Sequence, residues 1–290
     1  MQTSYPAWCA RNIAPRHDTG DAFLALPAHI LVTPILSSEH LPDPTDLARL
    51  RAVDREMRDA VAATGREVYE LGVKEAIERG NLSGLQLLRQ RGDLDEDTDV
   101  FDSLCIMAAR DGHLATLKWL RSRDFPWDEE TCEYAADGGN LEELQWAHDN
   151  GCPWNEDTCI FAASGGHLGV LQWAREKGCP WNGFTCSTAA NGGHLEMLKW
   201  AHENGCPWDE YTTMYAADGG HLEVLQFARA KGCPWDKWTC SLAAKGRQLE
   251  VLKWARANAC PWDEDTCKFA AEGKHFELLS WARANGAPEP

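Results

Sequence analysis

Residues 152–178 read Cys152-Pro-Trp-Asn-Glu-Asp-Thr-Cys-Ile-Phe-Ala-Ala-Ser-Gly-Gly-His-Leu-Gly-Val-Leu-Gln-Trp-Ala-Arg-Glu-Lys-Gly178. Copies of this stretch follow one another through most of the chain. They occupy residues 98–124 (degenerate at its start), 125–151, 152–178, 179–205, 206–232, 233–259 and 260–286. A fixed period of this length is typical of solenoids, in which each unit buries its apolar surface against its neighbours. We therefore expect a solenoid.

Each copy carries the signals of two short helices. From residue 125 onward an Asp or Asn follows a Trp, and such residues cap the free N–H groups of a first helical turn. These caps are Asp128, Asn155, Asn182, Asp209, Asp236 and Asp263. The preceding Trp stands where a hydrophobic staple would reach the fourth helical residue, which is usually Cys. A glycine pair such as Gly165-Gly166 should end the first helix, because glycine adopts positive φ at little cost. A second helix, for example 168–177, should follow.

The run Thr-Cys-x-x-Ala-Ala-x-Gly-Gly-His-Leu-Glu-x-Leu-Lys-Trp resembles the ankyrin repeat signature. The Ala-Ala, Gly-His-Leu and terminal Gly match, whereas the Pro and His of the usual Thr-Pro-Leu-His box are absent. The unit is also shorter than usual, which implies that the projecting hairpin is reduced to a Cys-Pro-Trp turn. The resemblance covers residues 98–286, and a weaker copy extends it back to about residue 71. It implies an all-α, ankyrin-like helix-turn-helix solenoid over residues 62–286 that binds proteins.

The charge of the chain is strongly negative. The formal net charge is −17, and residues 93–290 carry 17 Lys and Arg against 33 Asp and Glu, which gives −16 for the array. A polyanion repels phosphate backbones, so we expect a protein target, basic in character, and no nucleic acid. The sequence has no signal-peptide pattern and no apolar run long enough for a membrane span. We therefore expect a cytoplasmic or nuclear protein without a membrane partner.

Most of the cysteines, histidines and tryptophans recur at fixed positions of the repeat, the histidines at one position and the cysteines and tryptophans at two each. Twelve cysteines in an intracellular chain are expected to be free, buried thiols, and the spacings of a zinc site are missing. The recurring histidines, such as His167, follow glycine at a helix start, where the ring can bridge backbone groups. Asn140 fills the same position in one repeat, which favours hydrogen bonding over metal binding. Twelve of the fourteen tryptophans recur, and we interpret them as core ladders.

The N-terminal region differs from the repeats. Residues 1–22 indicate a loose tail, and residues 287–290 a short one. Residues 23–61 indicate either a helical cap for the stack or a segment that resembles an F-box. The matching residues are Leu26, Pro27, Ile30, Ile35, Leu36, Leu47, Leu50 and Val53. His29, Asp54 and Met57 depart from the motif. The resemblance implies a substrate adaptor that docks on a ubiquitin-ligase adaptor subunit through this segment.

Comparison of the repeats with one another indicates a binding face on the first helices. The positions two, five and nine residues after the cap lie along one face by helical spacing and vary most. In the three consecutive repeats 179–259 they are Phe184, Ser187, Asn191, Tyr211, Met214, Asp218, Trp238, Ser241 and Lys245. The two-after-cap residues of these repeats are all aromatic. They form either an exposed stripe for a partner or part of the core against neighbouring tryptophans.

The functional hypotheses are therefore a plain interaction scaffold and a ubiquitin-ligase substrate adaptor. The sequence contains no nucleophile elbow, P-loop or dinucleotide-binding glycine fingerprint. We expect no enzyme activity and no cofactor.

Overall fold

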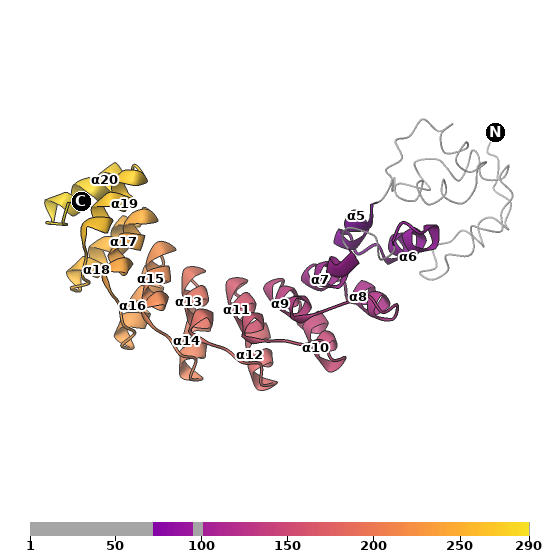
Figure 1. Cartoon of the computed structure of the whole chain (residues 1–290). Helices are drawn as coiled ribbons and strands as arrows, with labels where there is room; N and C mark the ends of the chain where they lie inside the picture. Colours follow the sequence, from indigo (N-terminus) through magenta and orange to yellow (C-terminus); the bar gives the residue numbers. More distant parts are fainter. Residues whose placement is uncertain (1–71, 95–100, 290) are drawn as a thin grey trace, which may run out of the picture. The chain divides into compact units, whose positions relative to one another are not determined.

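The computed structural model describes residues 72–94 and 101–289, and these consist of helices and turns with no strand (Figure 1). The expected all-α fold is confirmed there. The chain divides into two compact units, residues 1–101 and 102–290. The predicted tail 1–22 and the F-box-like segment 23–61 lie outside the described residues, as do residues 95–100.

The described part of the first unit is one helix pair. It consists of α5 (Val73–Glu78) and α6 (Leu82–Arg91). Asn81 caps α6 by accepting a hydrogen bond from the Gly84 N–H at 2.9 Å. Ile77 and Leu85 are fully buried. The weaker copy predicted near residue 71 therefore folds as a helix pair.

The second unit has one helix pair per repeat. A 3₁₀ turn, η1 (Phe101–Ser103), precedes it. The first helices of the pairs are α7 (Leu104–Arg110), α9 (Glu129–Asp137), α11 (Glu156–Ser164), α13 (Gly183–Asn191), α15 (Glu210–Asp218), α17 (Lys237–Lys245) and α19 (Glu264–Glu272). The second helices are α8 (Leu114–Arg121), α10 (Leu141–Asp149), α12 (Leu168–Glu176), α14 (Leu195–Glu203), α16 (Leu222–Ala230), α18 (Leu249–Ala257) and α20 (Phe276–Ala284).

Each first helix begins at the predicted cap. The Asn155 side chain accepts a hydrogen bond from the Asp157 N–H at 2.8 Å, and the same bond forms at the other five caps. The cap residue is extended, with φ −143° at Asn155, so the helix starts abruptly after the Trp turn. A capping bond of this kind stabilises a helix by about 0.5–2 kcal/mol. The N-cap prediction is confirmed.

The glycine pair and the histidine form a clasp between repeats. Nε2 of His167 lies 2.8 Å from the carbonyl oxygen of Asp137, the last residue of the preceding first helix. Gly166 has φ +74°, and a Cβ there would lie 2.5 Å from the ring of His194 in the next repeat. Glycine is therefore needed both for its backbone conformation and for close approach. Where histidine is absent, the Asn140 and Gln248 side-chain amides donate the equivalent bonds, to the carbonyls of Arg110 and Asp218. The structural role predicted for the histidines is confirmed.

The eleven described cysteines are free and buried, as predicted. The first Cys of a repeat donates to the carbonyl of the preceding cap, as Cys179 does to Asn155 at 3.2 Å. Burial raises the pKa of the Cys105 and Cys233 thiols to about 12. These thiols are thus packing groups that also tie one repeat to the next.

The recurring tryptophans do not form the centre of the core, which corrects the interpretation of them as core ladders. Trp181 and Trp200, from the turn and the second helix of one repeat, contact each other edge to face with centroids 5.8 Å apart. The Arg175 guanidinium of the preceding repeat covers Trp181 at 4.1 Å. These rings are half-buried and pack on the buried core from outside. The ladder therefore lies at the edge of the core, and Cys, Ala and Leu side chains fill its centre.

The two helix layers of the second unit differ in spacing. Successive first helices pack closely along their length, whereas successive second helices touch at few points. The first helices approach closely because their facing residues are small, such as the fully buried Ala162 and Ala163. The stack therefore curves toward the first-helix layer, which carries the odd-numbered labels in Figure 1. At its C-terminal end Ala287 is buried and Glu289 pairs with Arg283 at 2.6 Å.

Candidate protein-binding face

The three two-after-cap aromatics are exposed. Phe184, Tyr211 and Trp238 keep 55%, 43% and 37% of their surface accessible. They form an aromatic stripe because each lies in the first turn of its helix, opposite the buried Ala pair. The Phe184 and Tyr211 rings lie 6.3 Å apart between centroids, so adjacent repeats present them side by side. The alternative that these rings belong to the core is wrong.

A second row of this face was not predicted. It is the six-after-cap position, and its residues are half-buried: Tyr134, Phe161, Thr188, Tyr215, Leu242 and Phe269. The Tyr134 and Phe161 centroids lie 5.4 Å apart, and Phe269 stacks on Trp238 of the preceding repeat at 6.4 Å. The signal in the sequence was the apolar character of this position in nearly every repeat, but that character is equally typical of packing.

Where the five-after-cap residue is small, it lies outside the binding face. Ser187 and Ser241 are buried, which corrects the prediction that they meet a partner. The Ser241 hydroxyl lies 3.4 Å from Oδ1 of Asp263, the N-cap of α19, and 3.4 Å from the hydroxyl of Thr266 within that helix. This position therefore faces the neighbouring repeat. Met214 is longer and stays partly exposed.

The nine-after-cap residues end the first helices on the same face. Asn191 and Lys245 are exposed, and Asp218 is half-buried. Their backbone carbonyls meet the clasp residues of the next repeat, as Asn191 does with Nε2 of His221 at 2.9 Å. Their positions are thus fixed by the clasp. We define the first-helix face as the two-, six- and nine-after-cap positions of α9 to α19.

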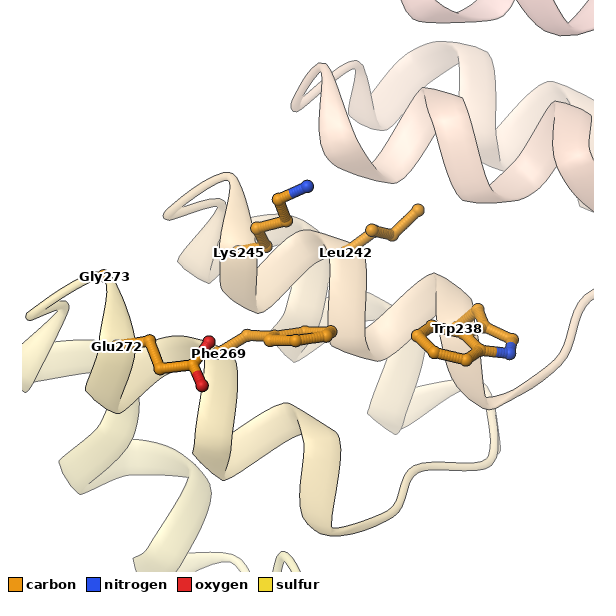
Figure 2. A pocket seen from close by; sticks show the side chains of 6 residues that line it. All are labelled: Trp238, Leu242, Lys245, Phe269, Glu272 and Gly273. Atoms are coloured by element: carbon orange, nitrogen blue, oxygen red, sulfur yellow. The ribbon is translucent and has the colours of Figure 1, made fainter.

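A groove opens on this face between the last two first helices. Trp238, Leu242 and Lys245 from α17 line one side, and Phe269 and Glu272 from α19, with its C-cap Gly273, line the other. Figure 2 shows Phe269 reaching from α19 toward α17, with Leu242 and Trp238 above and beside its ring. The groove is partly open to solvent, and its volume is about 410 Å³. Its lining is mostly apolar, with Lys245 and Glu272 as the charged members.

Ion pairs neutralise the acidic side chains at only one end of the first-helix face. Near the groove, Lys237 pairs with Asp263 at 2.6 Å and Lys268 with Asp265 at 3.6 Å. On α9 and α11, Glu130 and Asp157 are exposed, and no Lys or Arg within residues 101–289 forms an ion pair with them. Nearby Glu133 is buried, and desolvation raises the pKa of its carboxyl. The acidic excess therefore lies in the N-terminal repeats of the face.

The described ranges 72–94 and 101–289 contain no cluster of three or more His, Cys, Asp or Glu side chains arranged to hold a metal ion. None of the helices in this part of the chain has the length and apolar character needed to cross a membrane.

Comparison with protein-family models finds no match, and comparison with curated protein sequences finds none either. Among solved structures, the chain is similar to the human ASB11 ankyrin repeat domain, with 16% sequence identity and a TM-score of 0.44. This similarity covers 54% of the chain and 83% of that domain. The repeating pairs of antiparallel helices, joined at glycine turns and clasped by histidine, make residues 102–289 an ankyrin-like helix-turn-helix solenoid.

Proposed function

We propose that the chain is a protein-interaction module that binds its target on the first-helix face. The observation that carries this proposal is the exposed aromatic stripe of Phe184, Tyr211 and Trp238. Exposed aromatic rings in adjacent positions are costly to leave in water and are enriched at binding hot spots, where they bury a large area with little rotamer entropy. The helices that hold them are fixed by caps and clasps, so the face is preorganised.

The test is partner capture by the full chain and by a variant with Phe184→Ser, Tyr211→Ser and Trp238→Ser. Loss of one hot-spot aromatic typically costs about 2 kcal/mol or more, so the triple variant should lose its partner. Its melting temperature should change little because the rings are exposed. Phe276→Ser is the matched control, since Phe276 is 70% exposed but starts a second helix. Capture that survives the triple change, or an unfolded triple variant, contradicts the proposal.

A finer proposal is that the chain is the substrate adaptor of a ubiquitin ligase. It rests on the resemblance of residues 26–61 to an F-box, and this segment lies outside the described residues. Deletion of residues 24–61 should then abolish recovery of ligase subunits and leave capture on the first-helix face intact. Equal recovery of ligase subunits with and without the segment would contradict the adaptor proposal and leave the proposed protein-interaction function unaffected.

A further inference from the structure

The two ends of the first-helix face differ in chemistry, and this difference selects a class of partner. We infer that the occupant is an extended basic segment of a protein. Its Lys or Arg side chains meet the acids of α9 and α11, and a bulky apolar side chain enters the α17–α19 groove. This inference rests on the proposed function and specifies the partner.

The groove accounts for the apolar end of the segment. Trp238 and Phe269 stack with an interplanar angle of 29°, and Leu242 completes the apolar lining. The Lys237 ammonium, 5.8 Å from the centroid of the Trp238 ring, is paired with Asp263. The volume of the groove, about 410 Å³, lies within the range of about 300–1,000 Å³ typical of ligand pockets. A large apolar side chain therefore fits the groove, and its burial would be favourable.

The acids of α9 and α11 account for the basic end. Glu130 and Asp157 occupy the position that is aromatic in the next three repeats. On the same face, Tyr134 and Phe161 form a ring pair with centroids 5.4 Å apart. Carboxylates together with partly accessible aromatic rings attract Lys and Arg through ion pairing and cation–π contact. An acidic or phosphorylated segment would be repelled there.

The net charge of the repeat array also favours a basic partner. Residues 93–290 carry a net charge of −16, and two of the lysines near the groove are already paired with aspartates. A positively charged segment would be steered to this surface and would reduce its self-repulsion. Complementary charge, together with the apolar groove, distinguishes this occupant from a neutral segment and from a second copy of the acidic array.

The repeat spacing sets the length of the segment. Four helix-to-helix steps separate the midpoint of α9 and α11 from the groove between α17 and α19. With packed helices about 8–10 Å apart, the distance is roughly 32–40 Å. An extended chain advances about 3.3 Å per residue, so the basic and apolar residues should be separated by roughly 10–12 positions.

The test is selection of a displayed random peptide library, about 16 residues long so that it spans the expected separation, on the immobilised full chain. We expect peptides with Lys or Arg clustered near one end and an aromatic or large aliphatic residue near the other, at the stated separation. Their affinity should fall with salt. Glu130→Lys with Asp157→Lys should weaken them roughly tenfold or more and flatten the salt dependence. Glu130→Gln with Asp157→Asn is the milder second variant.

The matched control reverses two charges elsewhere. Glu196 and Glu250 are exposed on second helices, so Glu196→Lys with Glu250→Lys makes the same change in net charge away from the face. A loss as large in this control, or a library that yields no such peptides, overturns the inference. Selected peptides that depend on Phe184, Tyr211 and Trp238 but lack basic residues also overturn it, while the proposed function stands. Peptides whose affinity is unchanged both by the Glu130 and Asp157 variants and by the triple aromatic variant would contradict both proposals.

Discussion

Glu133 is a buried carboxyl in a first helix, and burial makes its charged form unfavourable. It occupies the buried five-after-cap position, where later repeats have Ser187 and Ser241. Desolvation is the main cause of its raised pKa, and the acids Asp157 and Glu130 raise it further. A carboxyl whose pKa is higher in the folded than in the unfolded state binds more protons when folded. The free energy of unfolding therefore falls as pH rises above 4.5, the ordinary value for this group.

Glu133→Gln should therefore raise the melting temperature at pH 7, because it removes a charge that is costly to bury. The gain should disappear below pH 4.5, where the carboxyl is protonated in both states. Thermal denaturation across pH measures this, with Glu223→Gln, an exposed glutamate on α16 away from Glu133, as the matched control. A destabilisation of equal size at both ends of the pH range would indicate that Glu133 is held mainly by its hydrogen bond with Asn155.

The buried thiols give a second prediction at the same scale. Burial raises the pKa of Cys105 and Cys233 from 9.0 to about 12, so almost no thiolate forms near neutral pH. Iodoacetamide should modify the eleven described cysteines slowly in the folded protein and rapidly in denaturant. Because the folded state holds these protons more tightly, stability should fall as pH rises from 9.0 toward about 12. Rapid alkylation of folded protein at these positions would contradict the packing described here.

At the scale of one helix, the N-cap links a repeat to its neighbour. The Asp236 side chain accepts from the Trp238 N–H at 2.9 Å, and the Asp236 carbonyl accepts from Cys260 of the next repeat at 3.4 Å. Asp236→Ala should cost about 0.5–2 kcal/mol. Hydrogen exchange should show the largest loss of protection in α17 and in the helices that pack on it, since a solenoid is coupled mainly between neighbours.

The control for the cap is Asp236→Asn, because Asn155 and Asn182 make the same bond in other repeats. This variant should keep most of the stability. A uniform loss of protection from α7 to α20 after Asp236→Ala would indicate one cooperative block and would contradict local coupling.

The helices themselves were predictable from the sequence, but one row of the face was not. The buried Thr, Cys and Ala positions of a first helix lie three, four, seven and eight residues after the cap. At about 100° per residue, these four positions form one face of the helix. The five- and six-after-cap positions lie on the other face, about 50° to either side of the direction that points straight away from the buried residues. Spacing alone cannot choose between them. The neighbouring repeat decides, because Ser241 faces α19 whereas Phe269 faces back toward exposed Trp238.

At the scale of the molecule, the period determines the architecture of residues 102–289. Most repeats supply a cap, a glycine pair, a clasp residue and a thiol, and these groups bond or pack against the adjacent repeat. In the last two repeats Arg247 and Lys274 take the place of the second glycine and adopt the same positive φ. These features follow from local chemistry and could be predicted from the sequence. The exposure of the aromatic stripe could not, because it depends on how closely successive first helices approach. The same close approach buries Ser187 and leaves Phe184 in solvent.

The most direct measurement of the central claim is site-specific photo-crosslinking of the full chain to its captured partner. A photoreactive phenylalanine analogue replaces Tyr211 in one variant and Phe276 in another, since both side chains are exposed but only Tyr211 lies on the first-helix face. Binding on this face predicts a covalent adduct with the partner from position 211 and none from position 276. Adducts from position 276 alone, or equally from both, would contradict it.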